Sequence, residues 1–320
     1  MSKVKVVVRS VRQKSPQSVV QEMFDSLGWH SFVPPHSSVV IKLNLNTADP
    51  TKIASANTSP ELVKAVCKVL QSRTRNITLV EAHAYRHSAD EAFNVCGIYN
   101  LAQHIGVRVV NLSEQPTRDV GINTIGQLPE ILLDADVFIT MPVVKTHALT
   151  YFTGSLKNQW GCVPRFDRIA LHWALDEMIV ELQRTLKPKL CIMDGIIGVE
   201  GRGPTNGKPR ELGIILGSTD AVALDATAMR FVGLDPQKAR HVLLASKAGL
   251  GEIDESSIQI DSDIVPDWPP FEPAKLDWAV AWMNRWSKYA WFRHYLLEID
   301  VVFQIGKRLV AVLRNIGVVR

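Results

Sequence analysis

The chain has 320 residues, of which 46% are hydrophobic and 21% are charged, which is ordinary globular composition and enough for one large domain or two modest ones. The net charge of +4 is unevenly distributed, because residues 275–320 carry eight Lys/Arg and three Asp/Glu while the preceding body is nearly neutral. A neutral body gives no electrostatic support for nucleic-acid binding, so no nucleic-acid partner is expected.

The predicted elements before residue 140 alternate between strands and helices. Val4–Val8 is a short apolar run typical of a strand, and Ser38–Leu43 (SVVIKL) is a second one. Ser59-Pro60 predicts the start of a helix to about Leu70, with proline at the first helical position. The other elements expected here are a helix over Pro16–Leu27, strands over Ile77–Val80, Val107–Val110 and Val137–Ile139, and short helices around Ser88–Val95 and Tyr99–Ile105. This alternation favours an α/β fold with one or more mainly parallel sheets flanked by helices.

The segment from Thr140 to Pro164 follows the last of these strands and has a different pattern. It shows neither the alternation of a half-buried strand nor a helical apolar stripe. Long loops inside a compact domain are uncommon, and they are usually functional or disordered. Because this one contains several aromatic and aliphatic residues that can pack, the sequence predicts an ordered, functional loop. It carries Lys145, His147, Lys157 and Asn158.

A second glycine-rich segment follows later in the chain. Leu171–Leu186 has apolar residues at helical spacing, and Lys189–Met193 is a predicted strand that ends at Asp194-Gly195. The next segment, Gly195–Pro209, is expected to be a loop. It contains neither GxxxxGK[ST] nor a GxGxxG placed between strand and helix, so nucleotide binding is disfavoured.

The last predicted elements complete the α/β domain and lead into a tail. They are a strand over Gly213–Leu216, a helix capped by Ser218-Thr219-Asp220 that runs through Phe231, and a helix over Gln237–Ala248. The expected organisation is an α/β domain over residues 1–260, a linker over 261–273, and an amphipathic, Trp-rich, basic helical tail over 274–320. Two lobes around a crevice are expected within the α/β domain, with the tail as a C-terminal helical extension.

Polar side chains follow four of the predicted strands at their carboxyl ends. In open α/β sheets, ligands bind in the crevice beyond these ends, so the sequence predicts a site there. The residues that follow the strands are Lys42, Asn44, Glu81, His83, Lys145, His147, Asp194 and Glu200. Lys157 and Asn158 of the Thr140–Pro164 segment are expected to join them.

The residue types indicate binding of a small anion. Lys145 and Lys157 can hold a carboxylate or phosphate by charge-assisted hydrogen bonds, and a partly desolvated lysine can act as a base or nucleophile. His147 can move a proton at neutral pH, or it can instead cap a helix or bind a backbone carbonyl. Both lysines can equally be solvated loop residues. Lys145, His147 and Lys157 are the catalytic candidates, and Asn44 and Asn158 would fix geometry.

Three other groups have a structural and a functional interpretation. Asp194 with Glu200 offers oxygen ligands for a hard cation such as magnesium, although two carboxylates are too few to predict a metal site. His172 and Asp176 are one turn apart on a predicted helix, which favours a structural pair. Asp225 lies on a mostly apolar helix, and a buried carboxylate needs a partner, so it has either a structural partner or a role at the site.

Six motifs occur in an order that resembles the domain of unknown function 362 family, over roughly residues 4–250. They are VIKLN (Val40–Asn44), TSPELV (Thr58–Val63), VKTH (Val144–His147), TGSLKNQWG (Thr153–Gly161), DGIIGVEGRGP (Asp194–Pro204) and DAVALDA (Asp220–Ala226). The resemblance implies an α/β domain of prokaryotic type. It places nine residues at the family's characteristic polar positions without giving their roles: Lys42, Asn44, Lys145, His147, Lys157, Asn158, Asp194, Glu200 and Asp225. Members of the family often carry a cysteine-rich, ferredoxin-like segment. This chain has no such segment, so no iron–sulfur cluster is expected.

The four cysteines support the same expectation. Cys67, Cys96, Cys162 and Cys191 are far apart and follow no CxxC spacing, which disfavours a cysteine-ligated zinc or iron–sulfur site. Free thiols in a reducing cytoplasm are expected. No stretch approaches 18 uncharged apolar residues and the N-terminus lacks the pattern of a secretory signal, so a cytoplasmic location is predicted, with contact at the membrane surface as a further possibility. Any other cofactor, or a metal, is left open.

The tail could bind one of several partners. Trp278, Trp282, Trp286 and Tyr289 recur at helical spacing, and basic side chains lie on the opposite face of the following stripe. This pattern suits a membrane surface, or packing on the body or on a second subunit in a homo-oligomer. The sequence therefore supports two functions. One is an enzyme that acts on a small anionic substrate; the other is a non-catalytic ligand-binding or redox-accessory protein with a docking tail.

Overall fold

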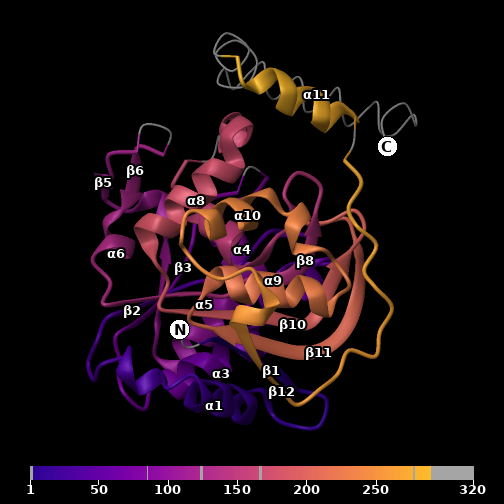
Figure 1. Cartoon of the computed structure of the whole chain (residues 1–320). Coiled ribbons are helices and arrows are strands. Elements are labelled where there is room, and N and C mark those ends of the chain that lie inside the picture. Colours follow the sequence, from indigo (N-terminus) through magenta and orange to yellow (C-terminus); the bar gives the residue numbers. More distant parts are fainter. Residues whose placement is uncertain (1–2, 85, 123–124, 166–167, 277, 290–320) are drawn as a thin grey trace.

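Strands form at the short apolar runs of the chain, and helices connect most of them (Figure 1). The computed structural model describes residues 3–84, 86–122, 125–165, 168–276 and 278–289. Its strands are β1 (Val4–Ser10), β2 (Val39–Lys42), β3 (Ile77–Glu81), β4 (Arg108–Asn111), β5 (Thr117–Asp119), β6 (Gln127–Pro129), β7 (Val137–Thr140), β8 (Val143–His147), β9 (Tyr151–Phe152), β10 (Leu190–Glu200), β11 (Lys208–Ser218) and β12 (Ile258–Ser262). Its α-helices are α1 (Pro16–Ser26), α2 (Ile53–Ala56), α3 (Pro60–Leu70), α4 (Ala89–Val95), α5 (Ile98–Ile105), α6 (Glu130–Leu133), α7 (Gly154–Asn158), α8 (Leu175–Leu186), α9 (Ala221–Phe231), α10 (Arg240–Lys247) and α11 (Trp278–Ser287). Short 3-10 helices include η3 (Gln159–Cys162) and η4 (Arg168–Ala174).

Most strands belong to one mixed sheet of ten strands. The order along it is β12-β1-β11-β10-β7-β2-β3-β4, with β8 attached to β10 and β9 attached to β8. Neighbours are parallel from β10 through β7, β2 and β3 to β4, and they are antiparallel at β1–β11, β10–β11 and β8–β9. The predicted α/β class with a mainly parallel sheet is therefore confirmed. The expected two lobes are not built on separate sheets, because this sheet is continuous.

The sheet separates two hydrophobic cores. Successive strand residues face opposite sides, so Val6 and Val8 belong to one core and Val7 to the other. Helices α1, α3 and α5 supply apolar residues to the core that contains Val7, while α8, α9 and α10 supply the other. In Figure 1, α1 and α3 lie below the strands and α8, α9 and α10 lie above them.

The Thr140–Pro164 segment is not the irregular loop that the sequence predicts. It contains β8, β9, α7 and η3, and most of its residues are buried. Each of these elements has only two to five residues. A five-residue helix has little more than one turn, and β8 is buried on both faces and so shows no alternation, which is why the hydrophobic pattern does not reveal these elements.

The predicted Gly195–Pro209 loop is also shorter than expected. Strand β10 continues to Glu200 and β11 begins at Lys208, so the two strands form a long antiparallel pair. Gly195 and Gly198 lie inside β10, where a Cβ atom would approach Ile214 Cγ1 to 2.8 Å and Phe271 Cζ to 2.9 Å respectively. At these two positions glycine allows close packing of neighbouring side chains against a strand, and it does not form a turn.

The segment predicted as a linker lies against the body. Strand β12 pairs in parallel with β1, and Phe271 beyond it is buried. The Phe271 N–H donates to the Val232 carbonyl at 2.8 Å, and Trp268 Nε1 donates to the Phe231 carbonyl at 2.9 Å. The predicted tail begins with α11, and its remainder at 290–320 is outside the described residues. Among the helices that the structure describes, none is long and apolar enough to span a membrane.

Candidate functional site

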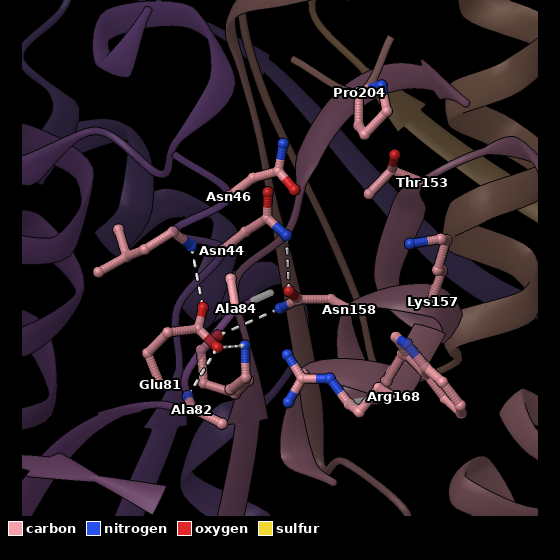
Figure 2. A pocket seen from close by; sticks show the side chains of 14 residues that line it. Asn44, Asn46, Glu81, Ala82, Ala84, Thr153, Lys157, Asn158, Arg168 and Pro204 are labelled. Atoms are coloured by element: carbon pink, nitrogen blue, oxygen red, sulfur yellow. Dashed lines mark hydrogen bonds and ion pairs between the residues drawn. The ribbon is translucent and has the colours of Figure 1, made fainter. Parts of the chain in front are cut away.

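A small pocket lies between the carboxyl ends of β2 and β3 and helix α7 (Figure 2). Its volume is about 90 Å³. Pockets for drug-sized ligands are larger, at roughly 300–1,000 Å³, so this one accommodates a small molecule or one end of a larger one. Five residues predicted from the sequence line it: Lys42, Asn44, Glu81, Lys157 and Asn158.

A buried ion pair forms one wall of the pocket. Lys42 Nζ lies 2.6 Å from Glu81 Oε1 and also donates to the Leu43 carbonyl at 2.7 Å. The Glu81 carboxylate accepts two further hydrogen bonds, from the backbone N–H groups of Leu45 and Ala82, both at 2.9 Å. The charge and hydrogen-bonding capacity of Glu81 are therefore largely satisfied within the protein, as a buried carboxylate requires.

The ion pair leaves no space for a side chain at Gly161. A Cβ atom there would lie 2.6 Å from Lys42 Nζ and 3.0 Å from Glu81 Oε1. The glycine lets η3 approach the ends of β2 and β3 directly, which closes this side of the pocket.

Lys145 supports the pocket from behind and does not line it. Its side chain is fully buried, and Nζ donates to Asn44 Oδ1 at 2.5 Å and to the Ala56 carbonyl at 2.6 Å. Asn44 Nδ2 donates to Asn158 Oδ1 at 2.8 Å, and Asn158 Nδ2 donates to Thr140 Oγ1 at 2.8 Å. Burial lowers the pKa of Lys145 well below its ordinary value, and the positive charge of Lys157 acts in the same direction.

Lys157 points into the pocket from α7 (Figure 2). Among the described residues, its ammonium group has neither a hydrogen-bond acceptor nor an ion-pair partner. Burial lowers its pKa to about 8, and the nearby cations Arg168 and Lys42 contribute to this shift. A lysine with a pKa close to neutral can exchange a proton near physiological pH.

Helix α7 is held in place by Asp225 of α9. The Asp225 carboxylate accepts the backbone N–H of Ser155 at 2.6 Å and that of Leu156 at 3.0 Å. Gly154, at φ +61°, contacts the same carboxylate, and a Cβ atom there would lie 2.5 Å from it. Burial raises the pKa of Asp225 to about 7, although both amide hydrogen bonds act to lower it. The structural interpretation of Asp225 is therefore correct, because it anchors the helix that carries Lys157 and Asn158.

The structure does not bring two of the predicted histidines to the pocket lining. His147 is buried, and its Nδ1 accepts the N–H groups of Leu149 at 3.1 Å and Thr150 at 3.2 Å, so it holds the turn after β8. Burial lowers the pKa of His147 well below its ordinary value, with Lys157 acting the same way. His83 Nδ1 accepts the N–H of Ala89 at the start of α4.

Asp194 and Glu200, the two predicted carboxylates of β10, do not line the pocket. Each has a structural role instead. Asp194 accepts the N–H of Ser59, which caps α3, at 2.8 Å and that of Ile196 at 3.0 Å. Glu200 forms an ion pair with Arg210 at 2.9 Å and accepts the N–H of Glu272 at 3.0 Å. Burial acts to raise the pKa of Glu200, but these contacts leave it below its ordinary value. Asp194 and Glu200 share no partner in these contacts, so the contacts give no support for a cation held between the two carboxylates.

The described part of the chain contains no group of three or more His, Cys, Asp or Glu residues placed to hold a metal ion. Its four cysteines are all buried and free. Burial raises the pKa values of Cys67 and Cys162 to about 12, so both are poor nucleophiles at neutral pH.

Several lining residues are not predicted from the sequence. They are Asn46, Thr153, Trp160, Gly161, Arg168 and Pro204, together with three small or apolar side chains after β2 and β3. Thr153, Trp160 and Gly161 belong to the TGSLKNQWG motif, which is a usable signal for them. Arg168 reaches the pocket only through tertiary folding, because it lies in η4 and follows no strand end, whereas Pro204 comes four residues after the end of β10 and closes the DGIIGVEGRGP motif. Arg168 donates to the carbonyls of Val163 at 2.6 Å and His83 at 2.8 Å.

The chain is similar in sequence to one known protein and, more distantly, in structure to another. The chain is 31% identical over 235 residues to the thylakoid-associated protein sll1697 of Synechocystis sp., covering 70% of this chain and 71% of that protein. The lactate racemase apoprotein from Thermoanaerobacterium thermosaccharolyticum superposes with a TM-score of 0.46 at 14% sequence identity. That superposition covers 71% of this chain but only 56% of the racemase, so the chain spans little more than half of it.

The family assignment rests on the part of the chain that builds the pocket. Residues 39–230 match the family described as Domain of unknown function (DUF362). This range includes β2, β3, α7 and α9, and so contains every pocket residue discussed above as well as Asp225. The chain therefore belongs to the DUF362 family, as its six motifs predict.

Proposed function

We propose that this protein is an enzyme that binds a small carboxylate- or phosphate-bearing molecule in the pocket beside α7. The observation that carries the proposal is the ammonium group of Lys157, which points into the pocket and has no partner among the described residues. Lys157 is half-buried, and partial desolvation of a cation without a counter-ion has a cost that a bound anion would offset.

The remaining polar groups of the pocket support an anionic ligand. Thr153 lines the pocket, and its buried Oγ1 has no hydrogen-bond partner. Among the described lining residues, Glu81 has the only carboxylate, and Lys42 already balances it. Thr153 directly precedes α7 and Lys157 lies on it, so this short segment offers a hydroxyl donor and an ammonium donor. Both donors suit the oxygens of a carboxylate or phosphate.

The pKa of Lys157, lowered to about 8 by burial, favours an enzyme over a binding protein. A group that changes protonation close to working pH is suited to proton transfer, and its neutral form is a nucleophile. The alternative is a non-catalytic ligand-binding or redox-accessory protein. In that case Lys157→Met would lower the affinity for the anion, and the wild-type protein would show no catalytic turnover.

A substitution at Lys157 tests the proposal. Wild-type protein is titrated calorimetrically with inorganic phosphate and with carboxylates of two to four carbon atoms. We expect at least one anion to bind, and Lys157→Met to weaken that binding by about 10- to 100-fold, since a hydrogen bond to a charged group contributes roughly 1.5–3 kcal/mol. Lys64→Met is the matched control, because Lys64 is an exposed lysine on α3 and lies outside the pocket. Equal anion affinity in the Lys157→Met variant and the wild type would contradict the proposal.

The pH dependence of binding gives a second test. Burial lowers the pKa of Lys157 to about 8, so its positive charge is present below that pH and is lost above it. We expect anion affinity to fall as pH rises through 8, by about tenfold for each further pH unit. Lys157→Arg keeps its charge throughout this range and should show a flat profile. A flat wild-type profile between pH 7 and pH 9.5 would argue against a role for the Lys157 charge.

A second proposal concerns the C-terminal segment, which we infer to associate with a membrane surface. Three observations support it: the printed name of the Synechocystis relative, the excess of positive charge in residues 275–320, and the exposure of Trp282 (52%) and Tyr289 (44%) on and after α11. Aromatic side chains beside basic ones are typical of helices that bind anionic lipid surfaces.

Vesicle sedimentation tests this second proposal. The full chain is expected to sediment with vesicles that contain phosphatidylglycerol and not with vesicles of phosphatidylcholine alone. A chain that ends at Pro273 should lose this binding. If the truncated chain binds the vesicles as well as the full chain does, the tail is not the segment that binds lipid. Self-association of the full chain without lipid would indicate instead that the tail forms a homo-oligomer.

A further inference from the structure

The pocket amides belong to a hydrogen-bonded chain that starts at a buried lysine. Lys145 Nζ donates to Asn44 Oδ1, Asn44 Nδ2 donates to Asn158 Oδ1, and Asn158 Nδ2 donates to Thr140 Oγ1. Asn158 Nδ2 also donates to the main-chain carbonyl of Lys42 at 3.3 Å. Asn44 and Asn158 line the pocket, whereas Lys145 and Thr140 do not.

The direction of this chain is fixed by the chemistry at its two ends. A carboxamide can turn its oxygen or its nitrogen toward a neighbour, and the choice follows from what that neighbour can accept or donate. At one end, the main-chain carbonyl of Lys42 can only accept, so it requires the nitrogen of Asn158. The oxygen of Asn158 then accepts from Asn44 Nδ2, which leaves Asn44 Oδ1 for an N–H donor of Lys145. Both amides must therefore be oriented as the structure has them.

The contacts of Lys145 match an uncharged amine. Nζ has two acceptors, Asn44 Oδ1 and the Ala56 carbonyl, and a neutral amine has two N–H bonds to give them. An ammonium group would have a third N–H and an unbalanced charge in a fully buried place. Lys157 and, more weakly, Lys42 also disfavour the charged form, while Glu81 and Asp194 act against them and favour it.

We infer that Lys145 is a neutral positioning residue whose N–H donors turn the pocket amides so that Asn44 presents nitrogen, not oxygen, to the ligand. Asn44 Nδ2 donates one N–H to Asn158 and keeps a second N–H for a ligand. Figure 2 shows Nδ2 on the side of the amide toward Lys157. The ligand then meets a row of donors made by Lys157, Thr153 and Asn44. This inference rests on the proposed function, and it narrows the ligand to a group with several acceptor oxygens, such as a carboxylate or phosphate, and excludes cations and amines.

The first measurement concerns the charge of Lys145 and does not depend on any ligand. NMR titration of the assigned lysine Cε and Nζ signals in the full chain should show Lys145 as a neutral amine at pH 7, with the signals of the exposed Lys64 as the reference. Asn44→Asp replaces the acceptor of Lys145 with a carboxylate of the same shape, and it should convert Lys145 to the ammonium form. A charged Lys145 in the wild type at pH 7 would overturn the inference.

The second measurement uses inorganic phosphate and acetate as probes in calorimetric titrations. Lys145→Met removes both donors from a residue that does not touch the pocket, and we expect affinity to fall about tenfold. Asn44→Asp should weaken binding at least as much, because an acceptor replaces the donor that faces the ligand. If Lys145→Met does not fold, Asn44→Asp alone decides. Unchanged affinity in a folded variant would overturn the inference.

The two measurements separate this inference from the proposed function. Absence of wild-type binding to every anion tested would refute the proposed function, and the charge of Lys145 would then decide the inference from the NMR titration. Wild-type binding with no response to Lys145→Met or Asn44→Asp would leave the proposed function supported and the inference refuted.

Discussion

Replacement of Lys42 by methionine is expected to lower the free energy of unfolding by about 3–5 kcal/mol, because it removes one partner of a buried ion pair. Lys42 and Glu81 are 1% and 5% exposed, and the Nζ–Oε1 distance is 2.6 Å. Without the lysine, the carboxylate keeps only the N–H groups of Leu45 and Ala82, which cannot balance its charge. Equilibrium unfolding in urea measures the effect.

Two variants control this experiment. The pair Arg118–Asp134 has a similar distance of 2.7 Å but is half exposed on both sides, so Arg118→Met should change the stability little. The double variant Lys42→Met/Glu81→Gln should recover part of the loss, since it no longer buries an unbalanced charge. A Lys42→Met variant that is as stable as Arg118→Met would show that the pair does not stabilise the fold.

Replacement of Gly154 by alanine is expected to destabilise the protein by about 2–4 kcal/mol, of which roughly 1–2 comes from the left-handed backbone and the rest from overpacking. Gly154 has φ +61°, and a Cβ atom would lie 2.5 Å from the Asp225 carboxylate. Either Gly154 or Asp225 must move, and both hold the start of α7. Because Lys157 and Asn158 follow on that helix, anion affinity should fall together with stability.

Gly106→Ala is the matched control for this experiment. Gly106 ends α5 with φ +71°, and no atom lies within 4 Å of the position that its Cβ would take. This variant carries the backbone cost without the steric contact, and the pocket should be unaffected. If both glycine variants lose the same stability and neither changes anion affinity, the contact between Gly154 and Asp225 does not position α7.

The sequence predicts the main sheet well because its central strands are uninterrupted apolar runs. Strands β2, β3 and β7 are buried on both faces, and their sequences contain almost no polar residue until the carboxyl end. The rule that ligands bind at these ends then identifies Lys42, Asn44 and Glu81 without any knowledge of the fold. Lys157 and Asn158, which the sequence analysis adds from the long segment after β7, line the same pocket.

The same rule fails for side chains whose direction depends on register or on short elements. His147 ends β8, and Asp194 lies within β10. The side chain of His147 accepts from a turn and that of Asp194 accepts from the residue that caps α3, so neither lines the pocket. Arg168 precedes a helix and joins the pocket from η4, a contact that no local pattern indicates. Strand β12 at the sheet edge is missed as well, although its sequence IQID alternates apolar and polar residues as a half-buried strand does.

The attachment of Glu272 connects the end of the body with the wall of the pocket. Its carbonyl accepts the N–H of Gly201 at 2.7 Å and its N–H donates to Glu200 Oε2 at 3.0 Å, in the turn that leads to Pro204. Tension applied to the chain beyond residue 273 would therefore be transmitted through these two bonds to the backbone that borders the pocket.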